Sequence, residues 1–82
     1  MFPDALLLLR VKQAHGVFSR PAHDPENTFD RLLAQLQAHA REQYVRITDC
    51  IPDRTLQEGA VVALVCEITT KGESVLIKAG LW

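Results

Sequence analysis

The sequence contains few of the residues that mark a specialised class of protein. Its 82 residues include two cysteines, four glycines and four prolines, and aromatic residues make up only 6%. Nine Lys plus Arg stand against ten Asp plus Glu, a net charge of -1, and no block of like charge occurs. The composition therefore gives no general attraction to nucleic acid or to an acidic membrane surface.

Local signatures of common sites are missing as well. The chain has no CxxC or HxxxH pair and no glycine-rich phosphate loop, so the sequence indicates neither a structural zinc site nor a nucleotide site. His15, His23 and Asp24 come nearest to a ligand cluster, but their spacing matches no recognised metal motif. We therefore expect no metal and no cofactor.

The sequence contains no apolar run of transmembrane length. The leucines in residues 1–10 lack the basic region and the small-residue cleavage site of a signal sequence, and no other stretch is long enough to span a bilayer. The length allows one domain, residues 1–82, with a small core. We expect a cytoplasmic protein.

What the sequence does contain is one nearly unbroken apolar stretch, residues 59–70, which predicts a buried strand. Alternate side chains of a strand point to opposite faces. One face receives Val62, Leu64, Cys66 and Ile68, and the other receives Val61, Ala63 and Val65. Because both sets are apolar, both faces of this strand need cover.

Three further strands are predicted around the central one. Residues 4–12 follow Pro3 as the first strand, residues 44–51 alternate between apolar and polar as the second, and residues 74–81 form the last. The second strand is expected to point Val45, Ile47 and Ile51 inward, and Tyr44, Arg46, Thr48 and Cys50 outward.

One helix is predicted. It begins at residues 24–26, where a candidate N-cap precedes a proline and an acid, with Asn27 or Thr28 as alternative starts. An apolar stripe at helical spacing follows, made of Phe29, Leu32, Leu33, Leu36 and Ala40. This stripe is wide enough to cover one side of a small sheet.

These elements predict an α+β domain of order β-α-β-β-β, a four-stranded, mostly antiparallel sheet with one helix packed on one face. A right-handed crossover makes the first strand parallel to the second, and a tight turn with Gly72 at a positive φ leads into the last strand. The second face of the sheet stays apolar and open. Its predicted members are Leu6, Leu8, Val61, Ala63, Val65 and Leu76.

An uncovered apolar face favours association. Two copies of one chain supply matching faces, and two-fold dimers dominate homo-oligomers. We therefore expect a non-enzymatic protein-binding or regulatory module that forms a homodimer or docks onto another protein.

The first alternative is a small-molecule-binding protein or small enzyme, with its site in a loop at residues 13–24 or between subunits. This loop is longer than most connections, and long loops often carry function. Its candidate ligand or partner residues are His15, Phe18, Arg20 and His23.

The second alternative is nucleic-acid binding through the outer sheet face. Basic groups beside aromatic ones on a sheet surface are typical of proteins that bind single strands. The candidate contacts are Arg10, Lys12, Tyr44, Arg46 and Lys78, with Trp82 nearby. Glu67 in their midst and the near-neutral total charge argue against this reading.

No catalytic residue is predicted. Cys50 and Cys66 are expected on opposite faces, as two reduced thiols, and nothing local activates Cys50. Asp49, Asp53 and Glu58 are typical of solvated turn residues.

Overall fold

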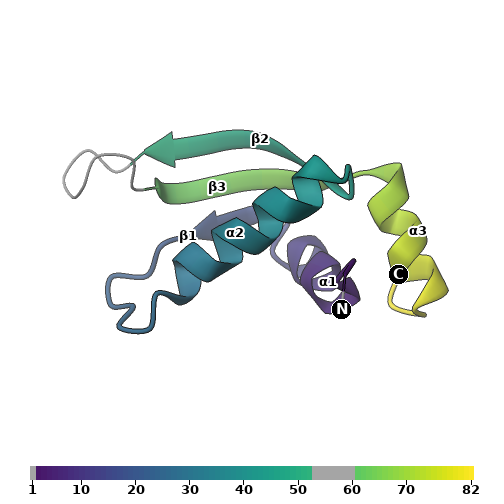
Figure 1. Ribbon diagram of the computed structural model, residues 1–82, viewed down its shortest axis with the longest axis horizontal. Helices are drawn as coiled ribbons and strands as arrows, with labels where there is room; N and C mark the ends of the chain where they lie inside the picture. The colour runs from purple at the N-terminus through teal and green to yellow at the C-terminus, as the bar shows by residue number, and fades with distance from the viewer. Residues whose placement is uncertain (1, 53–60) are drawn as a thin grey trace.

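The computed structural model describes residues 2–52 and 61–82, and within them three helices and three strands. In chain order these are α1 (Ala5–Gln13), β1 (Val17–Ser19), α2 (Thr28–Arg41), β2 (Val45–Pro52), β3 (Val61–Ile68) and α3 (Thr70–Lys78). The strands form an antiparallel sheet of order β1-β3-β2, so β3 is central as predicted. Helices α1 and α2 lie on one side of the sheet and α3 lies at its end (Figure 1). The predicted α+β class is confirmed.

The predicted first strand is wrong, because those residues form α1. Asp4 caps this helix: its Oδ1 accepts hydrogen bonds from the amides of Leu6 at 3.1 Å and Leu7 at 3.2 Å. Alanine and leucine, which fill the first turns, are strong helix formers. A short apolar run does not reveal by periodicity alone whether it is a strand or a helix, and here propensity and the cap decide.

The predicted last strand is also wrong, because it is helix α3. The Thr69 hydroxyl accepts a hydrogen bond from the Gly72 amide at 3.1 Å and so caps the helix. Gly72 lies inside the helix rather than in a hairpin turn. A Cβ at Gly72 would overlap the carbonyl oxygen of Tyr44, so the glycine permits a close backbone approach and is not needed for a positive φ.

The segment predicted as a loop contains the third strand, β1. Gly16 turns the chain out of α1 with a φ of 77° and accepts a hydrogen bond from the Cys66 amide at 2.9 Å. Phe18 then pairs with Leu64. This short strand occupies the place beside β3, antiparallel to it, so the described sheet has neither a fourth strand nor a parallel pair.

A β-bulge at Thr48 changes which side chains of β2 face the helices. Ile47 pairs with Cys66, but Asp49 already pairs with Val65, so one residue is left over. Beyond the bulge Cys50 pairs with Leu64 and Ile51 with Ala63. The predicted directions of Cys50 and Ile51 are therefore wrong, and each lies on the face expected for the other.

One hydrophobic cluster joins all six elements. It consists of Leu7, Leu8, Val11, Phe18, Phe29, Leu32, Leu33, Leu36, Val45, Leu64, Cys66 and Leu76. Four of the five members of the predicted helix stripe belong to it, and the fifth, Ala40, packs against it. Of the residues in β3, only Leu64 and Cys66 are buried, and both point to the face that the helices cover.

Alanine substitutions at Leu6 and Leu8 distinguish a helix from a strand at residues 5–13. A strand would place both side chains on one face, whereas in α1 Leu8 is fully buried and Leu6 is 70% exposed. We expect Leu8→Ala to lower the free energy of unfolding by about 2–5 kcal/mol and Leu6→Ala by less than about 0.5 kcal/mol. Urea unfolding of both variants checks this, and equal losses would contradict the helix.

Candidate functional site

The face of the sheet that no described helix covers carries four apolar side chains. Val17 pairs with Val65 and Ile51 with Ala63, so these four share one face. Asp49, the second partner of Val65, and Ser19, the second partner of Ala63, lie on it as well, whereas Val61 pairs with Pro52 beyond a register shift and packs against the core. Val17 is 52% and Ile51 42% exposed, and the other two are half-buried. We call the four apolar residues, Val17, Ile51, Ala63 and Val65, the open sheet face.

The predicted interface set lies only partly on this face. Ala63 and Val65 are members, but Val61 packs against the core cluster. Leu8 and Leu76 are fully buried in the core, and Leu6 lies on the exposed side of α1. The prediction for these three leucines is wrong because their segments are helices. Sequence reasoning missed Val17 and Ile51 because it placed no strand at residues 17–19 and no bulge in β2.

Polar residues border the open sheet face near the start of β2. Arg46 and Glu67 are paired across the strands and form an ion pair, with Arg46 Nε 3.0 Å from Glu67 Oε1. Both side chains are more than half exposed, so the pair contributes little stability. The pair forms a polar border at one end of the apolar surface, and its two charges cancel.

Two of the four predicted loop residues have structural roles. Phe18 is buried in the core. Arg20 Nε donates to the Val61 carbonyl at 2.9 Å, and its Nη2 meets Asp30 Oδ1 at 2.7 Å. Arg20 therefore ties β3 to the first turn of α2.

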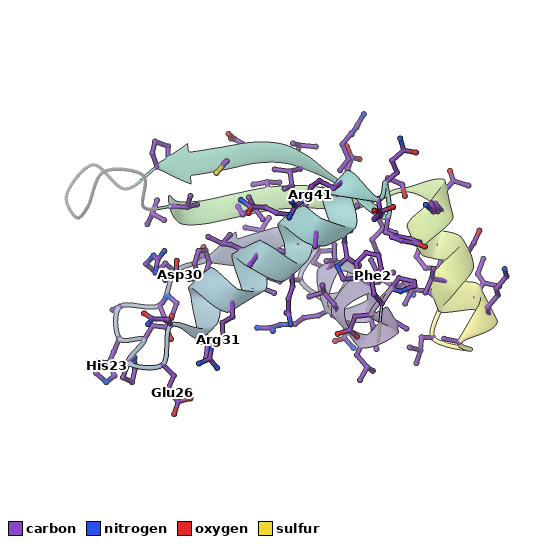
Figure 2. All side chains as sticks on the ribbon, in the orientation of Figure 1. Phe2, His23, Glu26, Asp30, Arg31 and Arg41 are labelled. Carbon is purple, nitrogen blue, oxygen red and sulfur yellow. The ribbon has the colours of Figure 1, made fainter. Side chains whose placement is uncertain are left out.

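The two predicted histidines of the loop do not come together. His15 lies just after α1 and lines a hollow of about 240 Å³ with Cys66 and Glu73. His23 is exposed near the tip of the loop (Figure 2). Residues 2–52 and 61–82 contain no group of three or more metal-ligating side chains. His15 and His23 thus lie at different places in the described structure.

The thiols are free, with Cys50 exposed and Cys66 buried. Burial raises the pKa of the Cys66 thiol, which keeps it protonated and weakly nucleophilic. Of the predicted acidic turn residues, Asp49 is exposed in β2, and Asp53 and Glu58 lie outside the described residues.

The predicted nucleic-acid contacts do not share a sheet face. Arg10 and Lys12 belong to α1, Lys78 ends α3, and only Arg46 projects from the open side of the sheet. Tyr44 lies in the turn before β2, with the Lys71 ammonium 4.4 Å from the centre of its ring. The prediction of one basic and aromatic surface is wrong because two of its strands are helices.

His39 is a buried polar residue that sequence reasoning missed. Its Nε2 accepts the Asp4 amide hydrogen at 2.9 Å, so its Nδ1 carries the proton and donates to the Gln35 carbonyl at 2.7 Å. Its ring lies 4.4 Å from that of Phe2. The sequence signal for its burial was its position three residues after Leu36, on the apolar stripe of α2. Its role is to fasten the start of α1 to α2.

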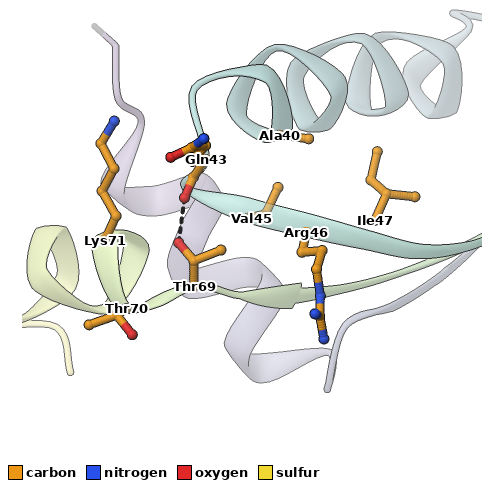
Figure 3. Close-up of a pocket in the computed structure, with 8 residues that line it drawn as sticks. All are labelled: Ala40, Gln43, Val45, Arg46, Ile47, Thr69, Thr70 and Lys71. Atoms are coloured by element: carbon orange, nitrogen blue, oxygen red, sulfur yellow. Dashed lines mark hydrogen bonds between the residues drawn. The ribbon is translucent and has the colours of Figure 1, made fainter.

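A groove of about 650 Å³ runs beside the start of β2 (Figure 3). Ala40 and Gln43, at the end of α2, form one wall, and Thr69, Thr70 and Lys71, at the start of α3, form another. Val45, Arg46 and Ile47 supply the strand between them. Thr69 Oγ1 donates to the Gln43 carbonyl at 2.5 Å and holds the two walls together.

No protein-family model, no curated protein and no solved structure matches the chain. In residues 2–52 and 61–82, every helix is too short or too polar to cross a bilayer.

Two carboxylates at the start of α2 make stability depend on acid pH. The Thr28 hydroxyl, followed by the Phe29 and Thr28 amides, lowers the pKa of Asp24, and the Arg20 guanidinium lowers the pKa of Asp30. Both pKa values lie below the usual 3.8 in the folded state. Their stabilising effect is therefore complete above pH 3.8 and is lost as the pH falls through the folded pKa values.

We expect Asp24→Asn to flatten this acid dependence, because the variant has one fewer proton to take up on unfolding. Urea unfolding between about pH 5 and pH 2.5 measures the slope. Glu26→Gln is the control, since Glu26 points away from the protein in the same loop (Figure 2). If Asp24→Asn and the wild type show the same slope of unfolding free energy against pH, the hydrogen bonds that Asp24 accepts at the start of α2 do not stabilise the fold.

Proposed function

We propose that this chain is a small, non-enzymatic protein-binding module that self-associates through the open sheet face. The observation that carries the proposal is the position of Val17, Ile51, Ala63 and Val65 on the one face of the sheet that lies away from the helices. Contiguous apolar surface of this kind marks interaction sites in soluble proteins.

Edge strand β1 and the part of edge strand β2 beyond Thr48 are poorly suited to pairing with a second chain. Association through the open sheet face is therefore favoured. Strand β1 is three residues long, and β2 is bulged at Thr48 and ends at Pro52. Short edge strands, bulges and prolines all discourage edge pairing. Face-to-face packing of two sheets avoids these obstacles.

A second copy fits the charge pattern of the face. The centre, at Ala63 and Val65, is apolar, the border residues Arg46 and Glu67 neutralise each other, and Asp49 beside Val65 adds one exposed carboxylate. A two-fold arrangement that keeps the two Asp49 side chains apart brings the apolar centres together without opposing like charges.

The size of the face suggests a reversible dimer. A patch of a few hundred Å² at about 25 cal/mol per Å² provides on the order of 5–10 kcal/mol before the cost of association is subtracted. Stable dimers bury about 800 Å² per partner. Such an assembly forms and separates with concentration, as suits a regulatory module, and the free thiols favour a cytoplasmic location.

Sedimentation velocity over a concentration series tests the dimer. We expect the wild type to shift from monomer to dimer as the concentration rises through about 10 μM to 1 mM. Val65→Lys should remain monomeric, because it places a charge at the centre of the buried face. Its fold should persist, since Val65 is only half-buried in the single chain.

Leu6→Lys provides the matched control. It introduces the same charge at an exposed apolar residue of α1, away from the open sheet face, so its dimerisation should equal that of the wild type. A wild type that stays monomeric at about 1 mM, or a Val65→Lys variant that dimerises equally well, would refute the proposal.

A further inference from the structure

The groove beside β2 follows the edge of the strand rather than either of its faces. Val45 and Ile47 point toward the helices, whereas Arg46 points to the open side, yet all three line the groove (Figure 3). Residues from both faces line one groove only where it passes along the strand's outer edge. Strand β2 is an edge strand of the described sheet, so nothing in the sheet occupies this position.

The backbone at this edge is oriented to receive another strand. The Thr69 amide donates to the Tyr44 carbonyl at 3.2 Å, which identifies that pair as hydrogen-bonded. Antiparallel pairs alternate between bonded and non-bonded, so Arg46 bonds to Glu67, and Val45 and Ile47 turn their amides and carbonyls outward. Val45 is almost fully buried, so its outward groups are covered, and the groove offers the outward amide and carbonyl of the half-buried Ile47.

The floor of the groove is apolar, and its charged wall is positive. Ala40 and Ile47 flank Val45, which is 2% exposed. The Lys71 ammonium contacts the Glu42 carbonyl at 2.8 Å and the face of the Tyr44 ring, and neither group neutralises its charge. Arg46 is already paired with Glu67. The groove therefore favours a ligand with an apolar side chain and a nearby carboxylate.

We propose that this groove binds an extended segment of a partner protein, rich in apolar and acidic residues, which adds to β2 along Val45, Arg46 and Ile47. Its backbone pairs with Ile47, an apolar side chain enters between α2 and β2, and a carboxylate lies beside Lys71. The bulge at Thr48 limits the pairing to this first part of the strand. The groove is a different surface from the open sheet face, so this inference goes beyond the proposed function.

The test uses a synthetic peptide, acetyl-EVTVE-amide, titrated into the full chain labelled with ¹⁵N. We expect saturable shifts, largest at the amide of Ile47, with a Kd of about 0.1–1 mM. The same peptide with both valines N-methylated should not bind, because it has lost the donors that would meet the edge of β2. This comparison needs no protein variant and is independent of folding defects.

The contribution of charge is tested by changing charged residues in the peptide and in the protein. The peptide acetyl-KVTVK-amide should bind several-fold more weakly than the acidic one, and Lys71→Met should remove most of that difference. Lys78→Met is the matched control, since it deletes the same charge at the far end of α3. It should leave both affinities unchanged.

Three results would overturn the inference. They are the absence of saturable shifts up to about 5 mM peptide, equal binding of the N-methylated peptide, and shifts centred on Val17 and Val65 instead of the groove. The last result would place the peptide on the open sheet face. Dimerisation is measured without peptide, so failure of the groove and failure of the dimer are separate outcomes.

Discussion

Burial of one side of β3 is the constraint on which the rest of the structure depends. Leu64 and Cys66 are the buried residues of the central strand, and α1 contacts this strand while α2 contacts its neighbour β2. All three helices contribute leucines to the core that these two residues join. Because the helices gather on that side or at the end of the sheet, no helix of residues 2–52 and 61–82 covers the opposite side (Figure 1).

The sequence was sufficient to predict the elements whose residue pattern fits only one kind of secondary structure. The alternation at the start of β2 and the stripe of α2 each match a single period, and β3 was identified from its nearly unbroken apolar run. It was insufficient for α1 and α3, where short apolar runs fit a strand as well as a helix. The deciding groups there were polar: Asp4 and Thr69 cap the helices through single oxygen atoms. Reading those caps before the apolar pattern would have corrected both assignments.

The candidate surfaces were predictable only where the strands were. Two members of the open sheet face, Ala63 and Val65, came from the alternation of β3, whereas Ile51 depends on the extra residue at Thr48, which shifts the alternation by one position. No local pattern in the sequence announces that bulge. The groove was not predictable either, because its walls come from the end of α2 and the start of α3, which meet only after the chain has folded.

Thr69 links the groove to the stability of the fold. Its hydroxyl donates to the end of α2 and accepts from the first turn of α3, and its amide bonds to the residue that precedes β2. One residue thus sets the width of the groove and also fixes where strand β3 gives way to helix. Widening the groove to admit a bulkier ligand would require breaking the helix cap that Thr69 makes. The shape of the groove is therefore tied to the stability of the fold.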